Sequence, residues 1–272
     1  MNTSVIHSKG PGGHGGRSTR ALSIAKLIDI QAFRAIDLGS NTGYNSFDLY
    51  ECGCKEVVGI EIRDDYLTIA NQEKAHLGYT NIKFLKLDVR KVDEFNLGKF
   101  DICLSSGLLY HMQNPFNLLK RIRNIARYLA LETHISPSLL NMFRCGRKYR
   151  KNLTLKKYRV FLDDIPFTGR LNIFPIHQDM TLTSGSINSH VTFWLDKKSI
   201  MTAIKQAGFR IIACYFEKTP GGLPPIYIDH GYRRTKIFIL AEAQEYNEYL
   251  PVRESVIRGC NLLSKHSDNT SF

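Results

Sequence analysis

The chain of 272 residues has no long hydrophobic run. None of its apolar stretches approaches the roughly 18 residues that a transmembrane helix needs. The N-terminus also lacks the apolar core of a secretory signal peptide. We therefore expect a soluble, cytoplasmic protein that does not enter a membrane.

Patterns that bind metal ions are missing as well. The six cysteines have no regular spacing, and Cys52 and Cys54 have no second pair with which to complete a zinc site. No spacing among the nine histidines resembles a metal site. We expect reduced thiols that are buried or idle, and no metal ion.

Acidic residues are scarce relative to basic ones, which leaves a formal net charge of +12. The segment 141–159 contains many Lys and Arg residues, interleaved with Phe143, Tyr149 and Tyr158, and no acid. Such a balance favours an anionic partner, whether nucleic acid, a phosphorylated metabolite or an acidic surface. The segment itself is either a solvated helix face or part of a cap whose cations hold a phosphate or carboxylate.

Short apolar strands alternate along the chain with helical patterns, which is typical of a doubly wound parallel sheet. Ligands of such folds bind beyond the carboxyl ends of the strands. We predict strands at 35–38, 56–61, 82–89, 100–106, 128–135, 191–194, 209–216 and 235–242. We predict helices at 18–30, 44–50, 64–76, 116–127 and 195–207.

The same rhythm divides the chain into parts. We predict a flexible leader or lid at 1–20, a nucleotide-binding core at 21–135, a cap insertion at 136–190, the completion of the core sheet at 191–245 and a tail at 246–272. Within the insertion, the Thr and Ser clusters of 167–189 indicate a loop.

The stretch 34–49 organises the chain, because a strand, a tight turn and a helix follow one another there. Gly39 permits the sharp turn, and Gly43 lets a ligand or the helix come close. The spacing is Asp37-x-Gly39-x-x-x-Gly43, whereas a dinucleotide fingerprint requires Gly-x-Gly-x-x-Gly.

Two later strands carry acids at or near their ends. Strand 56–61 ends in Glu61, about 20 residues past the glycine turn, the distance at which α/β folds place an acid on a ribose hydroxyl. Strand 82–89 carries Asp88 in the same way. Because the carboxyl ends of parallel strands share one edge, we expect both acids to lie close to Asp37.

These residues resemble the class I S-adenosylmethionine (SAM) methyltransferases over nearly the whole chain. The matching motifs, in the family's order, are Asp37-x-Gly39-x-x-x-Gly43, Glu61, Asp88, Gly107-Leu-Leu-Tyr-His111 and the segment from Phe193-Trp194 to Gly208-Phe209. The resemblance implies an α/β, Rossmann-like, seven-stranded and mostly parallel sheet with helices on both faces. It also implies an antiparallel last strand between strands five and six, and a cap insertion after strand five.

The resemblance implies that SAM is the cofactor. In the family the glycine turn packs on the amino-acid part of SAM, a residue like Asp88 accepts from the adenine amino group, and the next backbone N–H meets the ring. The predicted cofactor-binding residues are Asp37, Gly39, Ser40, Asn41, Gly43, Glu61, Ile62, Asp88, Val89, Ser105 and Gly107.

The predicted catalytic residues, His111 and Tyr110, lie just past strand four. An unperturbed His titrates near pH 6.5, which suits a general base, although His111 has the alternative of capping a helix or packing on the cofactor. Tyr110 shapes the pocket, and His134 and His190 are further residues that could reach substrate. Positioning of the reactants can lower the barrier by about 7 to 11 kcal/mol. A general base contributes a rate factor of about 10² to 10⁴, which is only about 3 to 5 kcal/mol.

A narrower resemblance involves Gly107-Leu-Leu-Tyr-His111, Leu131-Glu-Thr and the Phe193-Trp194 helix. These are similar to bacterial tRNA wobble-uridine carboxymethyltransferases, which use carboxy-SAM. In that family a Lys, the motif Tyr and an Arg near the last strand hold the extra carboxylate. Tyr110 matches here, and the other candidate positions are Lys9 and either Arg234 or Lys236.

We therefore predict a SAM-dependent methyltransferase that acts on an O or N atom of a small, anionic metabolite. One alternative is a tRNA wobble-uridine carboxymethyltransferase that uses carboxy-SAM, whose RNA binding would weaken steeply with salt. The other is a non-catalytic, methyltransferase-like partner protein, which would bind SAM weakly or not at all.

Overall fold

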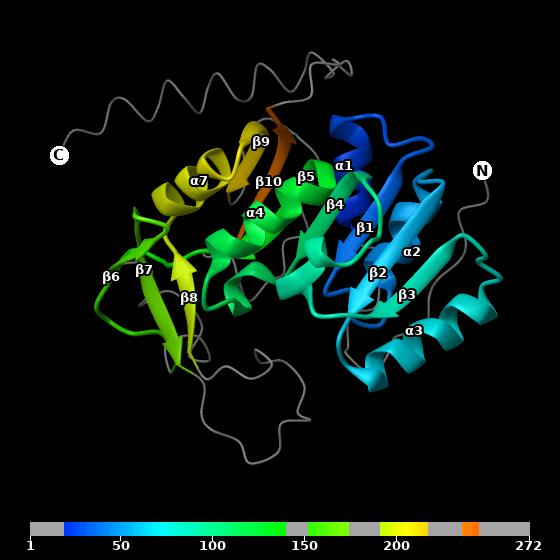
Figure 1. Cartoon of the computed structure of the whole chain (residues 1–272), viewed down its shortest axis with the longest axis horizontal. Coiled ribbons are helices and arrows are strands. Elements are labelled where there is room, and N and C mark those ends of the chain that lie inside the picture. The colour runs from blue at the N-terminus through cyan, green and yellow to red at the C-terminus, as the bar shows by residue number, and fades with distance from the viewer. Residues whose placement is uncertain (1–18, 140–151, 174–190, 217–235, 245–272) are drawn as a thin grey trace.

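The computed structural model describes residues 19–139, 152–173, 191–216 and 236–244. Its main feature is a seven-stranded sheet with the strand order β3-β2-β1-β4-β5-β10-β9 (Figure 1). Strand β10 pairs antiparallel with both β5 and β9, whereas β1 to β5 pair in parallel. The predicted mixed sheet is therefore confirmed, including its antiparallel last strand.

In chain order the elements are α1 (Thr19–Leu27), β1 (Arg34–Leu38), α2 (Tyr44–Glu51), β2 (Glu56–Glu61), α3 (Asp64–His76), β3 (Ile82–Lys86), the 3-10 helix η1 (Val89–Glu94), β4 (Phe100–Ser106), the 3-10 helix η2 (Leu109–His111), α4 (Pro115–Ile125), β5 (Ala126–His134), β6 (Tyr158–Leu162), β7 (Ile165–Ile173), β8 (Val191–Leu195), α7 (Lys197–Gln206), β9 (Phe209–Phe216) and β10 (Lys236–Ala243).

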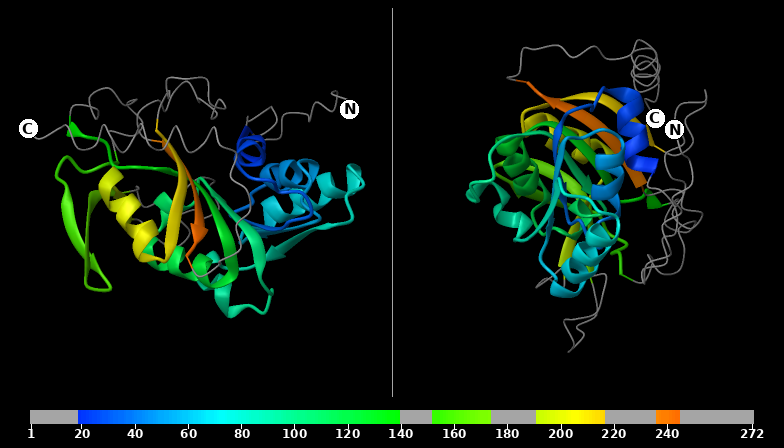
Figure 2. Two further views of the ribbon diagram at one scale, coloured as in Figure 1. Left: turned by 90° about the horizontal axis from the view of Figure 1, so that it is seen from above. Right: turned by 90° about the vertical axis from the view of Figure 1, so that its right-hand side faces the viewer.

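Helices cover both faces of this sheet, with α1 and α2 on one side and α4 and α7 on the other (Figure 2). Ile24 of α1 and Phe47 of α2 pack into one apolar core, and Phe116 of α4 and Ile200 of α7 pack into the other. A strand between two such layers must be apolar on both faces, which explains the continuous run of β2.

Several predicted boundaries differ from the structure, and two of the differences matter most for the site. The helix predicted to end at Arg127 ends at Ile125, because Ala126 already has extended backbone angles and pairs with Phe100 of β4. The strand predicted at 82–89 ends at Lys86, and Asp88 instead caps η1 by accepting a hydrogen bond from the next turn.

A second sheet, β6-β7-β8, lies beside the first at the left of Figure 1. The loop predicted at 167–189 is wrong for its first residues, because Phe167 to Ile173 belong to β7. Strand β8 was expected to complete the core sheet, but it pairs antiparallel with β7. A Cβ atom at Gly169 would lie 2.2 Å from the carbonyl oxygen of Trp194, so this pairing depends on a glycine.

Helix α1 begins at Thr19, so Arg20 belongs to a helix and not to the predicted leader 1–20. None of the described helices is long and apolar enough to cross a membrane. Several predictions fall outside the described residues. These concern Lys9, His190, Arg234, the first part of the basic segment and the tail 246–272.

Candidate active site

The turn after β1 is built by backbone hydrogen bonds. The N–H groups of Gly39 and Ser40 both donate to the carbonyl of Ile60, each at 2.9 Å. Gly39 and Gly43 have φ values of +71° and +89°, which disfavour any residue with a side chain. A Cβ atom at Gly43 would also lie 2.7 Å from Cζ of Phe84, so this glycine admits close packing against β3.

Asp37 lies at the base of this turn with no exposed surface. Ser46 donates to its Oδ2 at 2.7 Å, while Oδ1 has no hydrogen-bond partner among the described residues. Burial raises the pKa of Asp37 to about 7, although Ser46 and the charge of Arg20 oppose the shift. The hydroxyls of Ser40 and Ser105 are likewise buried without a partner in the described chain. Three polar atoms at the ends of β1 and β4 are thus unsatisfied, which is costly unless a ligand binds them.

Glu61 ends β2 and is 3% exposed. Its carboxylate accepts the backbone N–H groups of Asn41 at 3.0 Å, Ile62 at 3.0 Å and Arg63 at 3.1 Å. The Arg63 guanidinium also pairs with it, at 2.9 Å from Nε to Oε1 and 3.2 Å from Nη2 to Oε2. Glu61 therefore joins the glycine turn to the end of β2.

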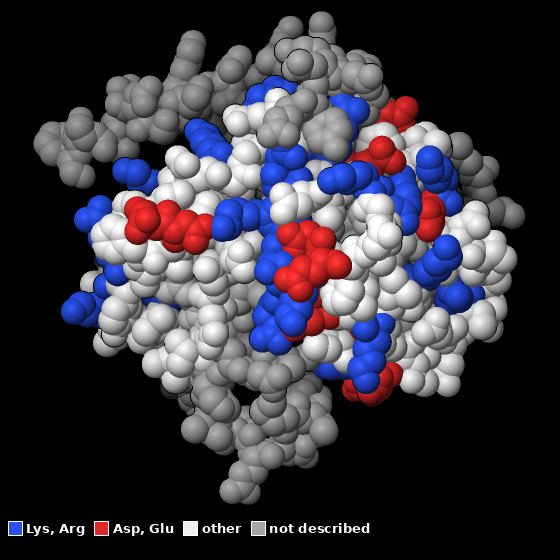
Figure 3. All heavy atoms as spheres, viewed as in Figure 1, with Lys and Arg blue, Asp and Glu red and all other residues white. Residues whose placement is uncertain are grey.

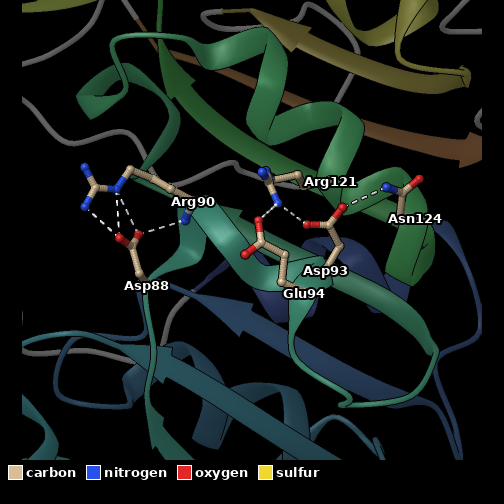
Figure 4. A network of polar contacts seen from close by, with 6 residues as sticks. All are labelled: Asp88, Arg90, Asp93, Glu94, Arg121 and Asn124. Carbon is tan, nitrogen blue, oxygen red and sulfur yellow. Dashed lines mark hydrogen bonds and ion pairs between the residues drawn. The ribbon is translucent and has the colours of Figure 1, made fainter.

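Asp88 repeats this arrangement one strand further along the sheet. Its carboxylate accepts the backbone N–H of Arg90 at 2.9 Å and the guanidinium of the same residue at 2.6 to 2.9 Å (Figure 4). The Arg90 side chain accordingly lowers the pKa of Asp88. Glu61 at the end of β2 and Asp88 after β3 are thus each followed two residues later by an arginine that pairs with the acid.

Helix α4 anchors the element that follows Asp88. Arg121 donates to Asp93 and, at 2.8 Å, to Glu94, while the Asn124 amide donates to Asp93 at 2.8 Å (Figure 4). These contacts hold η1 against the core and so fix the direction in which Asp88 emerges from the sheet.

Four rings form what we call the aromatic cluster: Tyr110, His111, His134 and Trp194. The ring of Tyr110 lies 4.2 Å from His111, 4.6 Å from His134 and 5.4 Å from Trp194, measured between centroids. His134 stacks on Trp194 at 5.0 Å with an interplanar angle of 12°. The cluster joins η2, β5 and β8, so it connects the core sheet to the insert sheet.

Both histidines of the cluster have lowered pKa values. Burial and the charge of Arg63 lower the pKa of His111 to about 4, and burial and the charge of Lys236 lower the pKa of His134 to about 3. The pKa of His111 therefore lies below the value near 6.5 of an unperturbed histidine. At neutral pH its imidazole is uncharged, and it is a weaker base than an exposed histidine.

Beside the cluster, Glu132 of β5 forms a buried ionic group. Its carboxylate, 3% exposed, pairs with Arg20 of α1 and with Lys236 of β10 at 3.2 Å. Burial alone would raise its pKa, but the two cations outweigh this and lower it to about 2. The backbone carbonyl of Glu132 accepts the N–H of Gly107 at 3.0 Å, which fixes the end of β4.

We compared the sequence and the fold with those of known proteins. Residues 31–159 match the family model described as a methyltransferase domain. The fold is similar to the N-terminal domain of EvdMO1, crystallised in the presence of S-adenosylhomocysteine (SAH) and D-fucose. The TM-score is 0.60 at 22% identity, covering 85% of this chain and 83% of that one. Residues 31–159 of this chain are a methyltransferase domain, and its fold is that of the SAM-dependent methyltransferases.

Other known proteins share this fold or match part of the sequence. The CcbJ methyltransferase from Streptomyces caelestis has a TM-score of 0.55 at 14% identity, over 87% of this chain and 93% of that one. A tRNA U34 carboxymethyltransferase from Campylobacter fetus subsp. fetus is 33% identical over 91 residues, which are 32% of this chain and 30% of the relative. The chain thus spans about a third of the length of such curated relatives.

Within the methyltransferase domain, the predicted cofactor residues gather at the carboxyl edge of the sheet. The Asn41 backbone bonds directly to Glu61, and the charges of Asp37 and Glu61 influence each other. Asp88 follows the strand that pairs with β2. The remaining predicted positions at this edge are Ile62 after β2, Val89 at the start of η1, and Ser105 and Gly107 at the end of β4.

Sequence reasoning missed Arg63 and Arg90 as cations of the candidate site, and it missed the pairing of Arg20 with Glu132. One signal was available, because an acid within the apolar run 128–135 requires a buried positive partner. The described residues contain no group of three or more side chains that could hold a metal ion.

Proposed function

We propose that this protein transfers the methyl group of SAM to an O or N atom of a small, anionic metabolite. The observation that carries the proposal is the joining of the Asp37 turn, Glu61 and Asp88 at one edge of the sheet. The unsatisfied polar atoms of Asp37, Ser40 and Ser105 support it, because they need a polar ligand at that edge.

The residues present fit SAM. The glycine turn with Asp37 and the two serine hydroxyls would hold the amino-acid part, Glu61 the ribose hydroxyls and Asp88 the adenine amino group. When bound, SAM supplies an activated methyl group, because its sulfonium leaves with the electron pair of the broken C–S bond.

The chain's own contribution to the chemistry is mainly positioning. The aromatic cluster lies just past the end of β4, and the neutral His111 would accept a hydrogen bond from the acceptor's O–H or N–H. Because its pKa is about 4, His111 does not retain the proton at neutral pH, and the proton passes to solvent. Most of the rate enhancement then comes from holding the acceptor near the methyl group.

The second candidate function is modification of a tRNA wobble uridine with carboxy-SAM, which the names of the curated relatives favour. That function would use Tyr110, which lies in η2, and the group of Glu132, Arg20 and Lys236 beside the aromatic cluster carries one net positive charge. However, basic and acidic side chains are interspersed on the face shown in Figure 3, without a continuous basic track in its described part. Lys157 of the basic segment pairs with Asp196 at 3.1 Å. We therefore place the small anionic acceptor first.

The test is transfer of label from methyl-tritiated SAM into a cell extract separated into small-molecule, RNA and protein fractions. The proposal predicts label in anionic small molecules that bind an anion-exchange resin, and a much weaker signal with Glu61→Gln. Glu56→Gln, at the opposite end of the same strand, is the matched control. Label in tRNA, strongest with carboxy-SAM, would support the second candidate. No label in any fraction from a protein that binds SAM would contradict methyl transfer altogether.

A further inference from the structure

The insert sheet contains a buried cation without a carboxylate partner. Arg170 lies on β7, the middle strand, and is 2% exposed. Its Nε donates to the carbonyl of Pro137 at 3.3 Å, and its Nη1 donates to the carbonyls of Thr154, at 3.0 Å, and Leu155. Among the described residues Arg170 makes no ion pair, and its Nη2 atom has no hydrogen-bond partner.

The contacts of Arg170 leave the positive charge of its guanidinium without a counter-charge. A guanidinium has five N–H donors, and the three carbonyls use those of Nε and Nη1, which leaves the two on Nη2. Carbonyls satisfy donors but do not neutralise a full charge, and a buried unpaired charge costs several kcal/mol. The burial of Arg170 also lowers its pKa. A negatively charged group placed at Nη2 would correct both the missing bonds and the missing charge.

No acid among the described residues pairs with Arg170. In residues 140–195 the acids are Asp163, Asp164 and Asp179. Asp163 and Asp164 form the turn between β6 and β7, where Lys120 pairs with Asp163. Asp179 lies outside the described residues, so the experiment below tests it directly.

Arg170 lies next to the side of the site where an acceptor would bind. It pairs in register with Trp194 on β8, and directly opposed residues of antiparallel strands point to the same face. The Trp194 ring contacts the ring of Tyr110, and Leu153 packs with both in a small apolar cluster. Pro137, whose carbonyl Arg170 binds, follows shortly after the carboxyl end of β5.

We propose that Arg170 is a specificity-determining residue that binds an anionic oxygen of the acceptor, from a carboxylate or a phosphate. The inference rests on the proposed function, because it takes the acceptor to bind beside Tyr110. It assigns the anion selectivity of the enzyme to a single guanidinium of the insert sheet.

The test uses inorganic phosphate and acetate as probes of the full-length protein. The NMR signal of the Arg170 Nε–H, assigned with the Arg170→Lys variant, is followed during titration of each anion. The proposal predicts a saturable shift with at least one anion, and the stronger binder identifies the class of acceptor. A signal that does not move with either anion would overturn it. The titration itself uses the wild-type protein, and the Arg170→Lys variant serves only to assign the signal.

Two variants complete the test by thermal shift with the same anions. Arg170→Met should weaken the saturable anion response at least tenfold, while Arg159→Met, an exposed arginine on neighbouring β6, should leave it within twofold. An unchanged response in folded Arg170→Met would overturn the proposal. In Asp179→Asn the Arg170 signal should stay in place; a large shift there would identify Asp179 as an internal counter-ion and also overturn it.

Calorimetry with SAM on the same preparations separates the two proposals. SAM binding with no anion response at Arg170 contradicts this inference and leaves the proposed function intact. An Arg170-dependent anion response without SAM binding contradicts the proposed function instead.

Discussion

The Arg63 guanidinium contacts both carboxylate oxygens of Glu61, through Nε to Oε1 and Nη2 to Oε2. Together with the three backbone N–H groups of Asn41, Ile62 and Arg63, these bonds exceed the roughly four lone-pair sites of a carboxylate. The hydroxyls of a ribose can therefore bind Glu61 only when the Arg63 side chain moves away.

Replacing Arg63 by Met should tighten SAM binding, because the competing cation is removed while the three backbone donors to Glu61 remain. A partly exposed ion pair is worth up to about 1 kcal/mol, so the dissociation constant should fall about two- to fivefold. Calorimetry with Arg159→Met as the control measures this. Weaker binding would instead mean that Arg63 itself contacts the cofactor.

Asp37 should make the wild-type protein less stable as the pH rises. Its folded pKa of about 7 lies above the value near 4 of an unfolded aspartate, so the folded state binds the extra proton between these limits. The contribution of Asp37 to the free energy of unfolding is at its maximum below about pH 4, and it is lost as the pH rises through 7.

The matched variant for this prediction is Asp37→Asn, which has no charge to bury. Relative to wild type, it should gain about 2 to 3 kcal/mol in the free energy of unfolding between pH 5 and pH 8. Urea denaturation at the two pH values measures the difference. A change that is the same at both pH values would show that Asp37 does not titrate in this range.

Replacing Glu132 by Gln should destabilise the fold, because Arg20 and Lys236 would lose their common counter-charge in a buried place. We expect a loss of about 3 kcal/mol in the free energy of unfolding. Glu94→Gln, whose pair with Arg121 is half exposed, should cost less than about 1 kcal/mol. Equal losses in the two variants by urea denaturation would argue against a buried ionic group.

Replacing His111 by Ala should lower turnover by about a factor of 10² while SAM affinity changes little, because the proposed function assigns His111 to the acceptor's proton. Its pKa of about 4 also predicts that kcat has no inflection near pH 6.5. Methyl transfer into the labelled acceptor fraction, followed from pH 5.5 to pH 9, measures both. Unchanged turnover would exclude His111 from the chemistry, and an inflection near pH 6.5 would contradict the lowered pKa.

Most of the core sheet could be predicted, because each buried strand is an apolar run bounded by turn residues. The strands 56–61, 100–106 and 209–216 have the predicted ends. Strand β7 could not be predicted, since it contains Pro166 and Gly169 and mixes polar with apolar residues. Its extended form depends on pairing with β6 and β8, which no local pattern records.

The acids of the candidate site could be predicted, but their partners could not. Glu61 and Asp88 follow from strand ends and spacing, whereas Arg63 and Arg90 look like ordinary surface residues in the sequence. Arg20 pairs with Glu132 across 112 positions of the chain, a contact that only the assembled sheet creates. The lowered pKa of His111 has the same origin, because burial follows from packing.

The most direct test of the account is calorimetric titration of the wild-type protein with SAM and SAH, beside Glu61→Gln and Glu56→Gln. Both substitutions lie on β2, but only Glu61 is at the edge that joins Asp37 and Asp88. We predict saturable binding of both nucleosides by wild type and Glu56→Gln, and binding at least tenfold weaker by Glu61→Gln. Absence of binding to the wild-type protein, or equal affinity in all three, would contradict the assignment of this edge as the SAM site.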